Sequence, residues 1–348
     1  MNKYKIINIS EESKFKFKEC FDNNSSEKQI NKIEWQFLNN PVQQQFVDIA
    51  LDTETDKTAA IYAIFPVQFK VKDTILCGSQ SLDTITDKDY RGQGLFIKLA
   101  NSVYRKAQES NVKLVYGFPN GNSIYGFQKK LEWSVLDPVP FLIKPLKTKY
   151  FTKHLSLLNF IPNLSLSFSK FKISKAYKLE FKNEFPVVVN DIWNFFSKDI
   201  QVAVNRDKKY LDWRYISKPN ENYKILHCFS AADEYLGFIV YTVKAKHGGK
   251  IGYIMEFIYD LNNPLAAKQL LAKAISEIKQ QKADCILSWC LDHSPNYRIF
   301  KNSLFFKMPE KLRPIELHFG VRAFDPVDKE LLYNRKNWYL SYSDSDTV

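Results

Sequence analysis

An arginine and two closely spaced glycines stand in the segment YRGQGLFIKLA, residues 90 to 100, at the start of a run with helical periodicity. Glycine at 92 and 94 lets the backbone turn sharply and approach a ligand closely. The first N–H groups of a helix have no partner inside the helix, and the helix dipole adds positive potential there. Arg91 supplies a fixed positive charge beside them. We therefore expect the turn to bind an anion, with phosphate as the natural choice.

Known phosphate-binding sequences limit this prediction. A P-loop requires GxxxxGK followed by Ser or Thr, and a dinucleotide-binding turn requires GxGxxG, but the segment contains neither. An isolated GxG also occurs in turns that only cap a helix, so the glycines by themselves leave both interpretations open.

The composition indicates a globular protein with anionic partners. The 348 residues are 45% apolar and 25% charged, which excludes a disordered chain and is enough for two domains. The net charge of +12 favours phosphorylated cofactors, sugar nucleotides, nucleic acid or acidic membrane surfaces. The lysines are spread along the chain without a recognised nucleic-acid motif, so we expect no nucleic-acid partner.

Cysteine usage and hydropathy indicate a reducing compartment. The five cysteines are scattered and form no CxxC pair, so we expect reduced, buried thiols and no metal site; they are Cys20, Cys77, Cys228, Cys285 and Cys290. The N-terminal residues have no apolar core of signal-peptide length, and no run of about 18 apolar residues occurs. We expect a cytoplasmic protein without a transmembrane segment.

Strands and helices alternate around the glycine turn. Apolar patterns predict strands at 3–9, 46–52, 59–71, 75–85, 113–118 and 139–146, with a short helix at 122–133. After the turn, one helical stripe is formed by Leu95, Leu99, Val103 and Ala107. The order predicts an α/β fold built on a mixed sheet.

The second half of the chain repeats the first at an offset of 173 residues. The segment FQKKLEW aligns with FKNSLFF, and KLVYGF aligns with CILSWC, in the same order. Where the first copy has YRGQGL, the second has DLNNPL, with neither glycine nor arginine. The repeat predicts two tandem lobes, each a mixed β-sheet flanked by helices, with the anion site in the first lobe alone.

Composition places the boundaries of these lobes. We expect a first lobe at 1–145, a basic linker at 146–185, a second lobe at 186–326 and a C-terminal tail at 327–348. Two interpretations of the linker remain open. It packs its apolar side on both lobes, or it is a basic amphipathic segment that contacts a membrane surface.

The glycine turn resembles the signature of the GCN5-related N-acetyltransferase (GNAT) superfamily. That signature, Arg/Gln-x-x-Gly-x-Gly/Ala, joins the fourth strand to the third helix and holds the pyrophosphate of coenzyme A with backbone amides. Residues 91–95 fit the signature, whereas Phe96 replaces the small residue at its last position.

Two flanking segments share this resemblance, which is specific over about residues 80 to 145. SLDTITDKDYRGQG resembles the strand whose splayed edge pairs with pantetheine, and GFPNGNSIYGFQKKLEW resembles a later motif along the other side of the cofactor. The resemblance implies that acetyl-CoA, or another acyl-CoA, contacts Thr84, Ile85, Thr86, Arg91, Gly92, Gln93, Gly94, Leu95, Phe96, Asn120, Asn122 and Ser123.

The reaction implied by the resemblance is attack of an amine on the thioester. It requires a group that removes a proton from the ammonium and one that protonates the departing thiolate. Many relatives use a tyrosine on the later helix as the acid, but Gln128 stands at the expected position and Tyr125 lies one turn earlier. Tyr125 is therefore our candidate acid, Asp83 our candidate base, and His293 a base or acceptor contact; an ordinary structural role is the alternative for each.

The second lobe is expected to shape the acceptor site. The cluster RDKKYLDWRYISKP suits stacking and phosphate binding, and packing between lobes is its alternative role. The predicted acceptor residues are Arg206, Trp213, Arg214, Glu256 and Asp292. We expect a small-molecule amine acceptor, and the basic balance favours an anionic one such as a nucleotide-linked amino sugar.

The sequence thus predicts an acyl-CoA-dependent N-acyltransferase. An aminoacyl transferase of the peptidoglycan-bridge type and a non-catalytic acyl-CoA-binding module are the alternatives. Whether the acidic C-terminal segment SDSDTV enters the site stays open at this stage.

Overall fold

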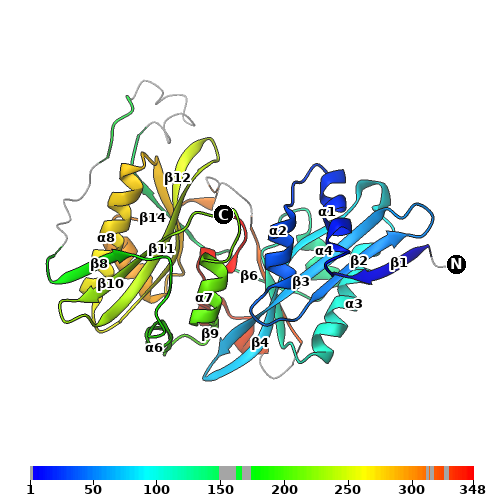
Figure 1. Cartoon of the computed structure of the whole chain (residues 1–348), viewed down its shortest axis with the longest axis horizontal. Coiled ribbons are helices and arrows are strands. Elements are labelled where there is room, and N and C mark those ends of the chain that lie inside the picture. The colour runs from blue at the N-terminus through cyan, green and yellow to red at the C-terminus, as the bar shows by residue number, and fades with distance from the viewer. Residues whose placement is uncertain (1–2, 149–161, 167–173, 311–312, 314–316, 325–328) are drawn as a thin grey trace.

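The computed structural model describes residues 3–148, 162–166, 174–310, 313, 317–324 and 329–348. Two twisted sheets lie side by side, and the C-terminus lies between them (Figure 1). The first sheet has the order β1 (Tyr4–Asn8), β2 (Phe46–Asp52), β3 (Thr58–Val71), β4 (Thr74–Thr86), β5 (Leu114–Gly117), β15 (Phe319–Ala323) and β6 (Ser134–Leu136), with β9 (Val202–Val204) beside β3. The second has the order β14 (Phe306–Lys307), β7 (Phe141–Pro145), β13 (Cys285–Trp289), β12 (Gly249–Tyr259), β11 (Tyr235–Lys246), β10 (Lys224–Ser230) and β8 (Tyr177–Phe181).

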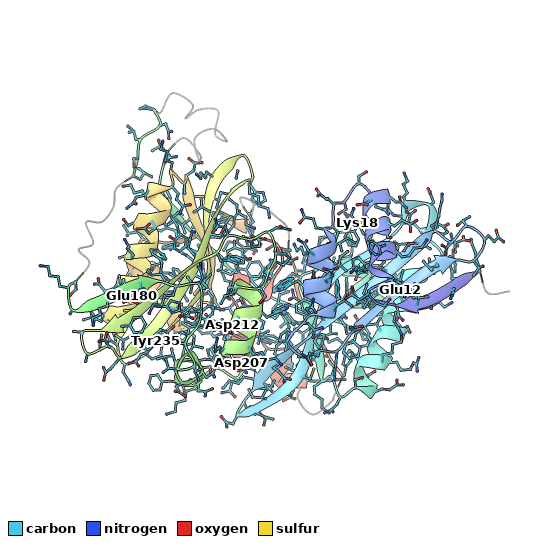
Figure 2. All side chains as sticks on the ribbon, in the orientation of Figure 1. Glu12, Lys18, Glu180, Asp207, Asp212 and Tyr235 are labelled. Atoms are coloured by element: carbon cyan, nitrogen blue, oxygen red, sulfur yellow. The ribbon has the colours of Figure 1, made fainter. Side chains whose placement is uncertain are left out.

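Helices flank both sheets. Those from the first half of the chain are α1 (Lys14–Asn23), α2 (Ile30–Ile33), the π-helical η1 (Glu34–Leu38), η2 (Lys88–Tyr90), α3 (Leu95–Glu109) and α4 (Ile124–Lys130). Those from the second half are α6 (Val189–Phe196), α7 (Lys208–Tyr215), α8 (Pro264–Gln280), α9 (Pro295–Asn302), α10 (Lys329–Leu332), η5 (Arg335–Asn337) and η6 (Tyr342–Asp344). The N-cap of α7 is Asp207, labelled in Figure 2, whose carboxylate accepts a hydrogen bond from the backbone N–H of Tyr210 at 2.8 Å.

Strand β3 shows why the first sheet is covered on both faces. Successive side chains of a strand point to opposite faces. Ile61, Ala63 and Phe65 belong to the core on the α1 side, whereas Tyr62 and Ile64 pack with the apolar stripe of α3. An apolar residue at nearly every position is what a strand buried on both faces requires.

The two sheets have the same strand order, which confirms the predicted mixed α/β fold with two related sheets. In each sheet, an antiparallel hairpin (β3 and β4, or β11 and β12) is followed by a parallel neighbour (β5 or β13). The helices α3 and α8 then connect the corresponding strands, as the internal repeat predicts.

One strand expectation is wrong. We expected residues 139–146 to close the first sheet, but β7 pairs with β13 and β14 of the second. In exchange, β15 from the second half lies between β5 and β6 of the first sheet. Each strand therefore lies between two strands of the other lobe's sheet, and its backbone is paired on both sides.

The lobes also share a hydrophobic core. Phe69 of β3 and Tyr116 of β5 pack against Trp338, and the same cluster continues to Trp193 and into the second sheet. Together with the exchanged strands, this continuous packing holds the two sheets against each other.

The linker and tail have more structure than we expected. Residues 177–181 of the expected linker form β8, and most of residues 329–348 are half-buried or buried. Much of the remaining linker, and hence its proposed membrane contact, lies outside the described residues. The domain boundaries themselves stay a prediction.

Candidate functional site

The strands β4 and β5 diverge at one end of the first sheet. Their parallel pairing runs from Ser79 to Ser81, whereas β4 continues to Thr86. On its other side β4 carries a bulge opposite β3. Leu82 and Ile85 of β4 pair with Ala63 and Ile61 of β3, so two residues of β4 (83 and 84) lie opposite one residue of β3 (62). The bulge turns β4 away from β5 and opens a gap between them.

A cleft of about 690 Å³ occupies this gap. Its walls come from β4, from the loop after β5 with the start of α4, and from the C-terminal segment. The lining residues are Gln80, Ser81, Leu82, Asp83, Thr84, Ile85, Thr86, Arg91, Phe96, Gly117, Phe118, Pro119, Asn120, Asn122, Ser123, Gly126, Phe127, Trp133, Ser345, Asp346 and Thr347.

The glycine turn lies at the β4 end of this cleft. Gly92 and Gly94 have φ angles of +77° and +72°, a conformation that disfavours other residues, and Gly94 is the N-cap of α3. A Cβ at either position would meet no atom within 4 Å, so the space beside the helix terminus is open. Gln93 turns aside, because its side-chain carbonyl accepts hydrogen bonds from Lys3 and Tyr4.

Phe96, the departure from the expected signature, packs in the first turn of α3. Its ring lies 5.3 Å from that of Phe127 and 5.7 Å from that of Tyr62, measured between centroids. Gly126 of α4 makes room for it, since a Cβ there would lie 3.0 Å from Phe96 Cε1. The bulky ring thus closes the space between α3 and α4 and leaves the backbone of the turn accessible.

The structure brings most predicted cofactor residues to the cleft. Those lining it are Thr84, Ile85, Thr86, Arg91, Phe96, Asn120, Asn122 and Ser123. Gly92, Gln93 and Gly94 lie in the exposed turn next to Arg91, and the side chain of Leu95 is buried in the core. Asn120 shapes its own loop by accepting hydrogen bonds from the backbone N–H groups of residues 122 and 123.

Of the predicted catalytic residues, one lines the cleft. Asp83 sits in the bulge with φ +52° and forms an ion pair with buried Lys28. Tyr125 is 65% exposed and does not line the cleft, because its position on α4 points to solvent. His293 is also elsewhere, since its Nε2 donates to the carbonyl of Trp338 at 2.9 Å beside a separate cavity.

The predicted acceptor residues Arg206 and Glu256 form a buried network instead. The side chains of both are fully inaccessible, and Arg206 Nε donates to Glu256 Oε2 at 3.1 Å. Arg206 also pairs with buried Asp344, and Tyr339 donates its hydroxyl proton to Glu256 Oε1 at 2.6 Å. Asp344 and Tyr339 belong to the C-terminal segment. Because an unpaired charge at such a buried place would be very unfavourable, the network fixes this segment in position.

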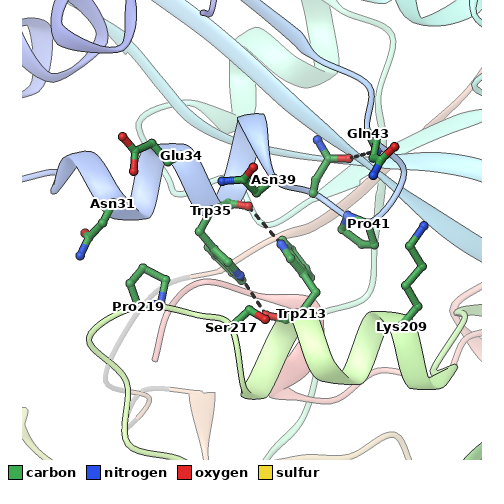
Figure 3. Close-up of a pocket in the computed structure, with 11 residues that line it drawn as sticks. Asn31, Glu34, Trp35, Asn39, Pro41, Gln43, Lys209, Trp213, Ser217 and Pro219 are labelled. Atoms are coloured by element: carbon green, nitrogen blue, oxygen red, sulfur yellow. Dashed lines mark hydrogen bonds between the residues drawn. The ribbon is translucent and has the colours of Figure 1, made fainter. Parts of the chain in front are cut away.

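The remaining predicted acceptor residues also pack outside the cleft. Trp213 of α7 stacks on Trp35 of η1 at 4.3 Å, and each indole N–H donates to the backbone carbonyl of the other (Figure 3). This pair borders a groove of about 400 Å³. Arg214 is buried and donates to the carbonyl of Ser345, while exposed Asp292 pairs with Lys307 at 2.6 Å. The structural alternatives therefore describe these side chains better.

The sequence left open whether the C-terminal segment SDSDTV enters the site, and in the structure this segment forms one wall of the cleft. Ser345, Asp346 and Thr347 line the cleft, although none of them was among the predicted site residues. Buried donors of the second lobe hold this wall, among them Arg214 and Lys218. Burial opposes ionisation of Asp346, but Lys218 and other neighbouring cations hold its pKa well below the ordinary value.

The corresponding place in the second lobe is filled. Where β12 passes β13, residues 339–341 of the C-terminal segment occupy the gap and leave a cavity of about 10 Å³. At the start of α8, the side chain of Asn263 accepts from the backbone N–H of Ala266. The second helix terminus is capped by its own chain, in agreement with the predicted loss of the anion turn.

Other kinds of site would require metal ligands, reactive cysteines or membrane-spanning helices. Within the described residues, no group of three or more His, Cys, Asp and Glu side chains is arranged to hold a metal ion. All five cysteines are free, and four are buried. None of the helices described here has the length and apolar character needed to cross a membrane. The cytoplasmic location stays a prediction.

Comparisons with known proteins agree with this geometry. Residues 6–136 match the family model of the acetyltransferase (GNAT) domain. No curated protein sequence matches the chain significantly.

Similar solved structures cover both sheets. N-myristoyltransferase of Saccharomyces cerevisiae with bound myristoyl-CoA is similar at a TM-score of 0.58 and 12% identity, over 92% of this chain and 83% of that one. A probable N-acyltransferase from Enterococcus faecalis V583 is similar at 0.59 and 12%, over 92% and 72%. A GCN5-related N-acetyltransferase from Anabaena variabilis is similar at 0.60 and 13%, over 92% and 73%. At these identities the likeness is one of fold.

Proposed function

We propose that this chain, a member of the GNAT superfamily through its acetyltransferase domain at residues 6–136, transfers an acyl group from acetyl-CoA or another acyl-CoA to a small amine. The observation that carries the proposal is the continuity of the glycine turn with the cleft between β4 and β5. Arg91 and Phe96 belong to both features, so an anion at the turn and a chain in the cleft can be parts of one ligand.

The dimensions of β4 suit an extended cofactor arm. Five residue steps lead from Ser81, where the pairing with β5 ends, to Thr86, the last residue of β4 before the turn. At about 3.3 Å per residue this is ~17 Å of strand edge. Backbone groups of β4 on this side are available to a pantetheine arm, while the turn amides and Arg91 would hold the pyrophosphate. An acyl-CoA supplies the reactive thioester when it is bound.

This placement directs the thioester to the bulge at Asp83 and Thr84. A backbone N–H near Ile85 or Thr86 would donate to the oxygen on which negative charge develops. The amine would approach from the side of the C-terminal wall, where the cleft is polar, lined by Gln80, Ser81 and residues 345–347. The nitrogen then forms a bond to the acyl carbon while the bond to sulfur breaks.

The charges around the cleft favour an acceptor with an anionic group beside its amine. Three cations surround the two carboxylates of the cleft: Lys28 pairs with Asp83, Lys32 pairs with Oδ2 of Asp346, and Arg214 lies 3.7 Å from its Oδ1. This arrangement agrees with the basic balance of the whole chain, and a nucleotide-linked amino sugar is one acceptor of this kind.

Release of free CoA thiol tests the proposal. Acetyl-CoA should raise the melting temperature of the protein, and a panel of amines should include one that yields thiol with turnover. Absence of a thermal shift at millimolar acetyl-CoA would contradict the cofactor site and favour an aminoacyl transferase. A shift without thiol release from any amine would instead favour a non-catalytic acyl-CoA-binding module.

A further inference from the structure

We propose that Asp346 and Lys218 form the proton-accepting pair of this acyl transfer: Asp346 faces the amine, and Lys218 takes up the proton behind it. The inference rests on the proposed function and assigns a step that its cofactor site leaves unassigned. Among the described residues that line the cleft, the carboxylates are those of Asp83 and Asp346, and the cleft contains no histidine, cysteine or tyrosine side chain.

The geometry of Asp346 divides its two carboxylate oxygens between two lysines. Oδ1 lies 2.9 Å from Lys218 Nζ, and Oδ2 lies 3.0 Å from Lys32 Nζ. Arg214 approaches Oδ1 at 3.7 Å. The side chain of Asp346 is 18% exposed and reaches the cleft, whereas that of Lys218 is fully inaccessible. A proton arriving at Asp346 from the cleft therefore has a buried amine directly behind it.

The surroundings of Lys218 favour the neutral form of its side-chain amine. Its Nζ donates to Tyr223 at 3.3 Å and lies 5.4 Å from the ring centroid of Trp35 and 3.9 Å from Glu221, which itself pairs with Lys244. Burial, followed by the nearby charge of Arg214, lowers the pKa of Lys218 to about 7, with a further contribution from Lys32, while Asp346 opposes the shift. Lys32 is different, because Asp346 raises its pKa above the ordinary value in spite of burial.

Asp83 is the other carboxylate of the cleft, and its ion pair is with one lysine, Lys28, which also donates to Gln36 Oε1 at 2.9 Å. Asp346 instead lies between two lysines. Lys218 combines the contact to this cleft carboxylate with a tendency to lose its proton near neutral pH.

The proton balance of the step is simple. The substrate ammonium gives one proton to neutral Lys218 through the carboxylate of Asp346, which leaves a neutral amine. The amine nitrogen bonds to the acyl carbon, and the carbon–sulfur bond breaks. The second nitrogen proton goes to the thiolate to give CoA thiol, and Lys218 returns the first proton through Asp346 to water in the cleft. Asp346 touches the substrate, and Lys218 acts through Asp346 as a positioning and proton-storing residue.

The test is the pH profile of kcat/KM in Lys218→Arg, with Lys147→Arg as the matched control, because Lys147 pairs with Asp284 at 2.9 Å outside the cleft. Arginine keeps the charge and the ion pair but does not become neutral. The wild type should gain activity as the pH rises through about 7. Lys218→Arg should lose this rise in activity and about 100-fold in kcat, whereas Lys147→Arg should stay within about threefold.

A second readout does not depend on activity. In protein labelled at the lysine side chains, one NMR resonance should titrate near pH 7 and be absent from Lys218→Arg. Titration of that resonance above pH 9 would overturn the proposal, as would a Lys218→Arg variant with the wild-type profile. Loss of the rise in kcat/KM near pH 7 in Asp83→Asn but not in Lys218→Arg would assign the step to Asp83 instead. If wild type binds acetyl-CoA but no amine yields thiol, the proposed function fails, and this assignment fails with it.

Discussion

Gly94→Asp tests whether the turn before α3 holds a diphosphate. Gly94 has φ +72° and ψ +7°, in the left-handed region where Asp and Asn are the best-tolerated residues other than glycine. A Cβ there meets no atom within 4 Å, so the substitution costs backbone energy and creates no clash. Gly94→Asn has the same shape without the charge and is the matched control.

The expected effect follows from Coulomb's law. A carboxylate about 6 Å from one phosphate charge, at an effective dielectric constant of about 20 to 40, is repelled by about 1.5 to 3 kcal/mol. This corresponds to a Kd for acetyl-CoA that is ~10- to 150-fold weaker in Gly94→Asp than in Gly94→Asn. The side chain of Gln93 is held by Lys3 and Tyr4, so it does not shield the new charge.

Calorimetric titration of both variants with acetyl-CoA measures this difference, and added salt should reduce it. The unliganded melting temperatures of the two variants should agree, since they share the same backbone strain. Equal affinities of Gly94→Asp and Gly94→Asn would refute a diphosphate at this turn, because a like charge at the helix terminus would then have no effect.

Two further predictions concern stability and one concerns catalysis. Arg206→Met leaves two buried carboxylates unpaired and should lower the unfolding free energy by about 3 to 5 kcal/mol, whereas Arg105→Met in the exposed pair with Glu109 should cost under about 1 kcal/mol by denaturant titration. Burial lowers the pKa of His227 to about 4, so between pH 6.5 and 4 the unfolded chain binds a proton that the folded chain does not. The free energy of unfolding should therefore fall by about 3 kcal/mol as the pH drops from 6.5 to 4, and by less in His227→Gln, as measured by thermal melts. Tyr125→Phe should leave kcat within about twofold by thiol release, because the residue points to solvent; a fall of about 100-fold would restore it as the acid.

Much of the candidate site could be predicted because its signals are local. Glycines at 92 and 94 adopt the positive φ angles that their spacing implied, and Leu95, Leu99 and Val103 form the buried stripe of α3. Turn chemistry and helical periodicity depend on residues within a few positions of one another, so the local sequence is enough to predict them.

The second lobe shows where such signals give the wrong role. Arg206 and Glu256 have the residue types of a binding site, and the sequence distinguishes a buried ion pair from an acceptor contact only if the partners are known. Their partners, Asp344 and Tyr339, lie more than 80 residues away from either Arg206 or Glu256. The pairing depends on how the C-terminal segment crosses the lobes.

The sequence by itself determined the glycine turn before α3, most strands of the first lobe and the internal repeat, because each depends on neighbouring residues or on a regular offset. Only the tertiary structure decided that β7 and β15 exchange sheets and that Asp346 completes the cleft. The physical reason is that strand edges and buried charges are satisfied by whichever partner the folded chain brings within reach, and sequence separation does not restrict that choice.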